Sequence, residues 1–414
     1  MVTRRTVLKG AAASAVALSS YGRWSVGYAA DNPIRIGVMT PLSGPAETSG
    51  RSVKAGVEIA AAQINAEGGV LGRPIQLEFR DDKANVAQAT AMAHELLGSG
   101  VNLLTGSNSS SVVAALGPVM QQENGVLIGT LASAASLNHE NYNPNVFRAS
   151  ETPYARMRGL AQIASKQSGD LKRWSGIIPD TDFGHSSWET FVGGLKEFFP
   201  SEAGVEPEIL DPIVVPLFSS DYKSYIADAM KTPFEGLFHA TYGADSVTLF
   251  QQARPYGLTK KAKAIYDSGN EFVVAKAMKE HTPAWWGSIF WYYGNHEDNP
   301  MSNALYEDYA AKYNDLPPEG YIAEGHADIY AFAKAIETAG STETAAVIDA
   351  LKGMEWETAT GIRTMRAEDN QAIKTIEAVY IEPADNENGW TISAADKVPG
   401  GDLIEPPSPG KKLE

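Results

Sequence analysis

The sequence predicts an α/β fold of two lobes, each built around a parallel β-sheet. Short apolar runs alternate with segments of helical periodicity along most of the chain, and this order favours parallel strands joined by right-handed crossovers. The alternation restarts after residues 147–150. At roughly 150 residues per domain, a chain of 414 residues also favours more than one domain. We therefore expect two Rossmann-like lobes of similar plan.

The first part of the chain predicts one sheet with its helices. Four apolar runs rich in Val, Ile, Leu and Phe predict strands at residues 34–39, 75–79, 101–104 and 126–128. Apolar residues at helical spacing, or polar capping residues, predict helices between them at 55–64, at 85–97 and in a segment that ends at 122. The loops that follow these strands would all lie at one edge of the sheet, where ligands bind in open parallel sheets.

The second part repeats the alternation and then becomes mainly helical. Strands are expected at 174–178, 209–215, 236–239, 264–266 and 286–291, between helices at 153–167, 187–199, 221–230, 245–256 and 271–279. The last third predicts helices at 302–313, 322–339 and 342–351, and a hairpin with strands near Thr364 and Val379. The tail at 399–414 has four Pro and no apolar period, so we expect it to be flexible.

The first 30 residues predict an export signal. Arg4 and Arg5 precede a weakly apolar run at 10–18, and small residues up to Ala30 suit a signal peptidase. The twin arginine resembles a Tat signal, but a Sec signal also begins with basic residues, so both routes stay open. The apolar run is too short to span a bilayer. We expect a mature chain that is soluble in the periplasm or elsewhere outside the cytoplasm.

Charge and composition exclude several classes of partner. Cleavage after Ala30 would leave 30 basic and 50 acidic residues, a net charge of −20, which repels nucleic acid and anionic lipid headgroups. Cys is absent, so no disulfide can form, and the seven His show no H-E-x-x-H pattern. The first strand is not followed by G-x-G-x-x-G. We expect no metal, no cofactor and a monomer.

Two loops at the carboxyl ends of predicted strands could hold a ligand. The loop at 106–111 is rich in Ser and opens a helix, so its hydroxyls and backbone N–H groups could face an anion. The same residues also suit a simple helix cap, and the spacing does not separate these two interpretations. The loop at 129–136 is made of small residues, which either admit a ligand or pack tightly on a neighbouring loop.

A hydrolytic site is the alternative from another functional class. His185 is followed by Ser186 and Ser187, and Asp182 lies close by in the sequence. These residue types form nucleophilic triads, but the closing Gly of a nucleophile elbow is replaced by Trp188. An exported hydrolase therefore stays open as a second hypothesis.

Several segments together resemble the type I periplasmic solute-binding proteins of ABC transporters, in the leucine/isoleucine/valine-binding branch. They are residues 36–44, 56–73 with the pattern Ile-Asn-x-x-Gly-Gly-x-x-Gly, 81–82, 242–245 and 252–258. The resemblance covers nearly all of the mature chain. It implies two lobes joined by three crossovers that close on a ligand, delivery of that ligand to an ABC permease, and no enzymatic activity. A sensor that presents its ligand to a receptor would look nearly the same.

The resemblance also implies domain limits and site residues. Lobe 1 would comprise 31–150 and 293–355, and lobe 2 would comprise 151–292 and 356–398. The ligand would be a small amino acid or a related carboxylate or amide, although Ala134 stands where many members carry Thr. The implied contacts are the serine loop for a carboxylate, the next loop, two aromatics, an acid for an ammonium and a side-chain contact: Ser109 and Ser110; Ala132 and Ser133; Phe183 and Tyr242; Asp267, with Glu271 second; and Tyr321.

Overall fold

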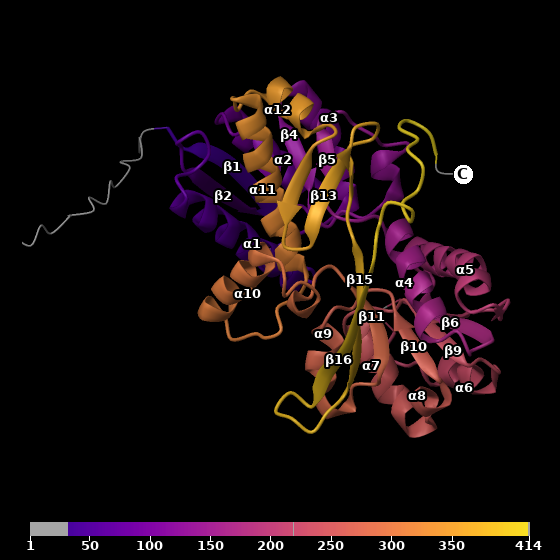
Figure 1. Ribbon diagram of the computed structural model, residues 1–414. Helices are drawn as coiled ribbons and strands as arrows, with labels where there is room; N and C mark the ends of the chain where they lie inside the picture. The colour runs from indigo at the N-terminus through magenta and orange to yellow at the C-terminus, as the bar shows by residue number, and fades with distance from the viewer. Residues whose placement is uncertain (1–31, 218, 413–414) are drawn as a thin grey trace, which may run out of the picture.

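Two eight-stranded sheets form the centres of two lobes, which lie at opposite ends of the molecule in Figure 1. This computed structural model describes residues 32–217 and 219–412. The predicted export signal at 1–30 therefore lies outside the described residues. No helix in the described part of the chain is long and apolar enough to cross a membrane.

The first sheet has the order β12-β13-β14-β5-β4-β3-β1-β2. Its parallel strands are β1 (Ile34–Thr40), β2 (Ile75–Asp81), β3 (Leu103–Thr105), β4 (Val126–Gly129) and β5 (Val146–Arg148). Its antiparallel edge is β12 (Glu355–Thr358), β13 (Gly361–Arg366) and β14 (Gln371–Ile373). One face is covered by α1 (Glu47–Ala66), α11 (Tyr321–Ala339) and α12 (Thr344–Leu351), and the other by α2 (Val86–Gly98) and α3 (Ser110–Gln122).

The second sheet has the order β16-β15-β11-β10-β9-β6-β7, with β8 also paired to β6. Its parallel strands are β6 (Arg173–Pro179), β7 (Glu208–Ile209), β8 (Ile213–Val215), β9 (Gly236–His239), β10 (Ala264–Asp267) and β11 (Trp285–Ile289), and its antiparallel strands are β15 (Ile376–Pro383) and β16 (Trp390–Val398). One face is covered by α4 (Pro153–Gln167) and α5 (Asp182–Glu202), and the other by α6 (Lys223–Lys231), α7 (Ala244–Ala253), α8 (Leu258–Lys261) and α9 (Val273–Met278).

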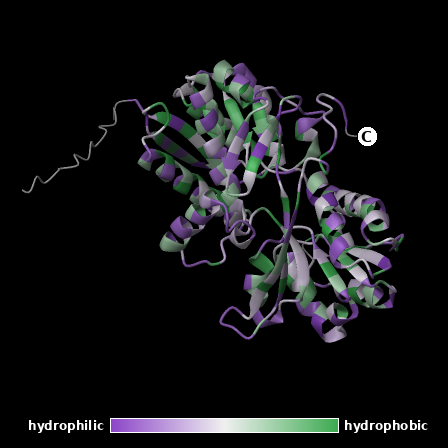
Figure 2. Cartoon of the chain, viewed as in Figure 1, coloured by the Kyte–Doolittle hydropathy of each residue, from purple (hydrophilic) through white to green (hydrophobic). Residues whose placement is uncertain are grey.

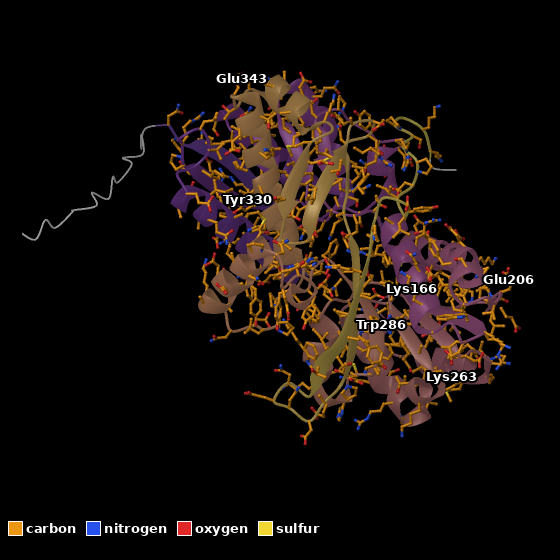
Figure 3. The ribbon with its side chains drawn as sticks, in the orientation of Figure 1. Lys166, Glu206, Lys263, Trp286, Tyr330 and Glu343 are labelled. Atoms are coloured by element: carbon orange, nitrogen blue, oxygen red, sulfur yellow. The ribbon has the colours of Figure 1, made fainter. Side chains whose placement is uncertain are left out.

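The remaining elements connect these layers. Helix α10 (Pro300–Lys312) packs against α1 of the first lobe. Short 3₁₀ turns lie at η1 (Ala135–Asn138), η2 (Arg254–Tyr256), η3 (Lys279–His281) and η4 (Tyr293–Asn295). Figure 3 labels Tyr330 and Glu343 on the first lobe and Trp286 and Lys166 on the second.

The central strands of each sheet are buried on both faces because the sheet lies between two layers of helices. In β1, Ile36 and Val38 join the core beneath α1 and α11, whereas Met39 joins the core beneath α2 and α3. In β9, Leu237 and Phe238 divide in the same way between the two cores of the second lobe. Figure 2 shows hydrophobic residues along the strands of both lobes. This burial explains why the sequence shows continuous apolar runs.

The Ile-Asn-x-x-Gly-Gly-x-x-Gly segment forms the connection from α1 to β2. The side chain of Asn65 accepts from the backbone N–H of Ile75 (2.7 Å) and donates to its carbonyl (2.9 Å), so it fixes the start of β2. Gly69 has a φ of +70°, and a Cβ there would lie 2.1 Å from the carbonyl oxygen of Arg73. Only Gly fits this close approach.

The predicted α/β fold of two lobes is confirmed, with three local differences. The predicted strand at 209–215 is two short strands, β7 and β8, because the chain between them contains Pro212 and leaves the ladder. The sheets are mixed at their edges rather than wholly parallel. The predicted hairpin near Thr364 and Val379 is wrong, because β13 and β15 pair in different sheets.

The predicted boundary between the lobes in the last third of the chain is also wrong. Residues 356–373 were assigned to lobe 2, but β12, β13 and β14 extend the first sheet through the pairing of β14 with β5. The second sheet takes over only at β15. Between β5 and β15 the chain therefore passes between the lobes three times: after β5, after β11 and after β14.

The C-terminal tail is packed, which contradicts the predicted flexibility of residues 399–412. Leu403 is buried against α4 of the second lobe, at Gly159. Buried Glu405 accepts from the hydroxyl of Thr152 (2.7 Å), and the backbone N–H of Gly410 donates to the carbonyl of His139 in the first lobe (2.6 Å). The tail thus runs from the second lobe to the first, and its end lies beside the first lobe in Figure 1.

Candidate ligand-binding site

The two predicted loops of the first lobe are brought together. Ser109 is the N-cap residue of α3, and its hydroxyl pairs with that of Ser111 (2.9 Å) rather than with the helix backbone. The hydroxyl of Ser110 accepts from the backbone N–H of Ala134 (2.9 Å), in the loop that follows β4. Ser110 therefore joins the serine loop to its neighbour, in addition to any contact with a ligand.

The loop after β4 is held from inside the lobe. Ala132 is buried, and the Arg148 guanidinium donates through Nη1 to the carbonyls of Ala132 (3.3 Å) and Ala134 (2.9 Å). Ser133 is half-buried, and its hydroxyl has no hydrogen-bond partner among the residues that the structure describes. Of the two residues predicted in this loop, Ser133 therefore has the free polar group.

The two predicted aromatics of the second lobe also lie together. Phe183 is in the first turn of α5, and Tyr242 is in the loop after β9. Their rings meet edge to face with centroids 6.4 Å apart. Phe183 is 38% exposed and Tyr242 is 44% exposed. The exposed edges and faces of the two rings can contact a ligand.

Asp267 ends β10 as predicted, but its carboxylate is occupied within the protein. It accepts from the backbone N–H (2.7 Å) and the side-chain amide (2.6 Å) of Asn270, and the Nε2 of His239 lies 3.3 Å away. Asn270 in turn accepts from the backbone N–H of Gly243 in the neighbouring loop (2.7 Å). Asp267 is fully buried, and burial raises its pKa. Through Asn270, the Asp267 carboxylate thus holds the loops after β10 and β9 in place.

Glu271, the second candidate acid, is occupied in the same way. Its carboxyl oxygens accept from the backbone N–H groups of Phe290 (2.7 Å) and Gly320 (2.9 Å). Burial raises the pKa of Glu271 to about 8, and Glu319 adds to the rise while Arg156 opposes it. Glu271 therefore links the second lobe to the crossover after β11 and to the start of α11.

Tyr321 lies where the two lobes meet. It is the first residue of α11 in the first lobe, and its ring centroid is 5.4 Å from that of Phe290 in the crossover after β11. Burial raises the pKa of the Tyr321 hydroxyl, and the nearby carboxyls of Glu271 and Glu319 raise it further. The predicted residues Tyr321 and Asp267 are thus neighbours across the lobes.

A residue that the sequence analysis missed lies in the middle of this group. The Arg156 guanidinium stacks on the ring of Phe290, with Cζ 3.6 Å from the ring centroid. Its Nη2 donates to Glu151 (2.5 Å), and a Cβ on Gly269 would lie 2.7 Å from its Nη1. The helical spacing in the sequence could have shown that Arg156 is buried, because it lies on the same apolar face of α4 as Leu160, one turn further on.

The hydrolytic alternative is not supported by the geometry. The Nε2 of His185 pairs with Asp180 (2.9 Å), not with Asp182. The hydroxyl of Ser186 donates to the carbonyl of Phe183, and Ser187 is buried on the other side of the helix. In residues 32–217 and 219–412, no three His, Asp or Glu side chains converge as a metal ion would require.

Comparison with known proteins identifies the family of this two-lobed chain. The family model described as periplasmic binding protein matches residues 33–387. The chain belongs to this family. The match leaves out all of β16 and all of the packed tail, so those parts lie beyond the common family segment.

Curated relatives of this periplasmic binding protein family cover most of the chain. The Leu/Ile/Val-binding protein BraC3 of Rhizobium johnstonii is 27% identical over 330 residues, which are 79% of this chain and 86% of that protein. A leucine-, isoleucine-, valine-, threonine- and alanine-binding protein of Pseudomonas aeruginosa is 24% identical over 351 residues, or 84% of this chain and 89% of that protein.

Solved structures of similar proteins confirm the fold. The closed conformation of a leucine-, isoleucine-, valine-, threonine- and alanine-binding protein from Brucella ovis has a TM-score of 0.79 at 19% identity, covering 91% of this chain and 98% of that one. A solute-binding protein of an ABC transporter from Rhodopseudomonas palustris BisB5, in complex with 3,4-dihydroxybenzoic acid, has a TM-score of 0.73 at 19% identity, covering 89% and 98%.

In this family member, one buried lysine connects all three crossovers. Lys374, in the crossover after β14, donates to the carbonyl of Phe290 in the crossover after β11 (2.8 Å) and to Glu324 of α11 (2.9 Å). It also pairs with Glu151 in the crossover after β5 (2.8 Å). Glu324 in turn forms a two-pronged pair with Arg363 of β13. The hinge between the lobes is therefore a buried ionic cluster.

Proposed function

We propose that this protein is the extracytoplasmic solute-binding subunit of an ABC transporter. It captures a small amino acid or a related carboxylate between its lobes and delivers it to a membrane permease. The family match over residues 33–387 carries this proposal. Two further points support it: relatives over most of the chain are described as Leu/Ile/Val-binding proteins, and a similar solved structure belongs to an ABC transporter.

The arrangement of the candidate site supports ligand capture by closure. The first lobe offers the free hydroxyl of Ser133 and the N-terminus of α3, where backbone N–H groups favour an anion. The second lobe offers the exposed rings of Phe183 and Tyr242. Because both sets lie at the carboxyl ends of strands and the lobes share a three-crossover hinge, a ligand would gain contacts from both lobes only after closure.

The experiment that tests capture is a binding screen with the purified mature chain. Amino acids, amides and small mono- and dicarboxylates are compared by thermal shift, and hits are measured by calorimetry. We expect one-to-one binding, and chromatography should return the ligand unchanged. Turnover of the ligand would contradict the proposal and favour the hydrolase.

Transport is tested separately from binding. Cells that lack this gene should lose uptake of the radiolabelled ligand, and a plasmid copy should restore it. The protein itself should be found in the periplasmic fraction. Normal uptake in the deletion strain, together with tight binding in vitro, would instead favour the ligand-presenting sensor.

A further inference from the structure

We propose that Arg156 is the second lobe's anchor for the ligand, and that it holds an anionic group at the end where an α-amino acid would carry its ammonium. The ligand would then be a small dicarboxylic acid without an amine. This inference rests on the proposed function and names the class of solute that the same site takes.

The first argument is the position of the Arg156 side chain. It reaches from α4 to the loop after β10, beneath Gly269, and stacks on Phe290 in a crossover. Gly269 has a φ of +145°, and any side chain there would collide with the guanidinium. Tyr321, the predicted side-chain contact of the first lobe, interacts electrostatically with Arg156. Arg156 therefore lies among residues implicated in ligand binding.

The second argument is that Arg156 has donors to spare. Only Nη2 has a partner among the described residues, namely Glu151. Nε and Nη1 donate to none of them, and neither is among the fully buried polar atoms without a partner. A guanidinium presents five N–H donors in a planar fork that matches a carboxylate. The unused donors are thus suited to an acceptor that arrives from outside.

The third argument is that the acids expected to hold an ammonium are already engaged. Asp267 is buried and accepts from Asn270, and Glu271 is buried and accepts from two backbone N–H groups. In the first lobe, Ala134 has no hydroxyl to help hold an amine. An ammonium buried here without a partner would cost several kcal/mol. Asp182, at the start of α5, is exposed. If the protein binds amino acids most tightly, Asp182 is the acid expected to pair with their ammonium.

The fourth argument is the charge of the hinge cluster. It contains three buried cations, Arg156, Arg363 and Lys374, against two buried carboxylates, Glu151 and Glu324. The neighbouring Glu271 has a pKa of about 8, so it is mostly protonated at neutral pH. Buried Asp328, whose pKa is raised to about 7, also interacts with Arg363, so the positive excess is smaller than one charge; a bound anion would reduce this excess, whereas a bound cation would increase it.

The first test uses ligand series that differ only at the end facing Arg156. Leucine, 4-methylpentanoate and isobutylmalonate share one side chain and carry an ammonium, a hydrogen and a carboxylate. Alanine, propionate and methylmalonate, and phenylalanine, 3-phenylpropanoate and benzylmalonate, repeat the comparison for smaller and larger pockets. In at least one series, we expect the dicarboxylate to bind at least about tenfold more tightly than the amino acid and the monoacid. One charge-assisted hydrogen-bonded pair provides an effect of this size.

The outcomes separate this inference from the proposed function. If the amino acid binds most tightly, or the monoacid equals the dicarboxylate, the role of Arg156 is disproved while ligand capture stands. If no member of any series binds, the inference is disproved and capture of small carboxylates fails with it.

The second test uses variants of the same helix. Arg156→Gln should reduce the preference for dicarboxylate over monoacid by about tenfold, and Arg156→Lys, which keeps the charge but loses the planar fork, should preserve only part of it. Arg158→Gln is the control, because Arg158 pairs with Glu197 on the outer side of α4. Thermal unfolding confirms that each variant folds. If Arg156→Gln lowers the affinity for all three acids equally, its role is structural only and the inference is wrong.

Discussion

The two lobes present different chemistry at the edges that face the hinge. The loops of the first lobe have small hydroxyl residues, and buried Arg148 holds backbone carbonyls of the loop after β4 from within. The second lobe and the crossovers have exposed aromatics above a layer of buried charge, which includes Arg156, Glu271 and Asp267. The edge of the first lobe is therefore held by local hydrogen bonds, whereas the edge of the second lobe depends on buried charged groups whose partners are also buried.

This difference predicts how each region responds to substitution. A surface hydroxyl can be lost at the cost of about one hydrogen bond, because water replaces it. A buried charge cannot be lost so easily, because its former partners stay buried and unpaired. The hinge cluster should therefore be sensitive to changes of charge and pH, and the serine loop should be sensitive mainly in ligand affinity.

The largest expected effect is that of Lys374→Met, which removes the cation that connects the three crossovers. Glu151 and Glu324 each keep one arginine but lose a buried partner. We expect the free energy of unfolding to fall by about 3–5 kcal/mol. Urea unfolding measures it, with the exposed Lys352→Met as control. A loss no larger than that of the control would show that the cluster does not stabilise the hinge.

The next effect is a pH dependence that comes from Glu271. Its pKa is raised from 4.5 to about 8 in the folded protein, so the folded state keeps a proton that the unfolded state has released. Its contribution to stability is therefore complete below pH 4.5 and is lost as the pH rises towards 8. From pH 5 to pH 7.5, the loss in free energy of unfolding should be about 1–3 kcal/mol smaller in Glu271→Gln than in the parent protein.

Thermal and urea unfolding at several pH values test this prediction. The exposed Glu337→Gln serves as the matched control and should leave the pH profile of the parent protein unchanged. If the Glu271→Gln profile is parallel to that of the parent, the carboxyl is ionised in the folded state and the cluster is more negative than described.

The smallest expected effect is in the serine loop. Ser110→Ala removes the acceptor of the Ala134 N–H and should lower stability by about 0.5–1.5 kcal/mol. Ligand affinity should fall by about 1–3 kcal/mol if the hydroxyl also contacts a carboxylate. Ser111→Ala, at the exposed neighbour, is the control. An unchanged affinity in calorimetry would leave Ser110 with only its role in joining the two loops.

Much of the fold could be predicted because its central strands are buried on both faces and stand out as apolar runs. The lobe boundary could not, because β12 and β13, the last two strands at one side of the first sheet, have alternating burial. Such a pattern shows that a strand has one covered face but not which sheet it joins. The tail was mispredicted because its order comes from a few long-range contacts, such as that between Glu405 and Thr152, which leave no periodic signal.

The places of the candidate residues in the fold could be predicted better than their contacts. Ser110 lies at the start of α3, after the loop that follows β3, and Asp267 ends β10, as expected, since strand ends are visible in the sequence. The partners that occupy them, Ala134 and Asn270, depend on the packing of loops. Arg156 was missed because an arginine in a helix is usually on the surface, and only the fold shows that this one lies beneath Gly269.

The packed tail sets a mechanical limit on the molecule. Leu403 is held by the second lobe, and Gly410 is tied to His139 of the first. Seven residues of extended chain reach at most about 25 Å. While both contacts hold, the two lobes cannot separate at these points by more than the length of the extended tail between them. The amplitude of opening is then limited by the length of the tail, as long as the Leu403 packing and the Gly410–His139 hydrogen bond hold, as well as by the stiffness of the hinge.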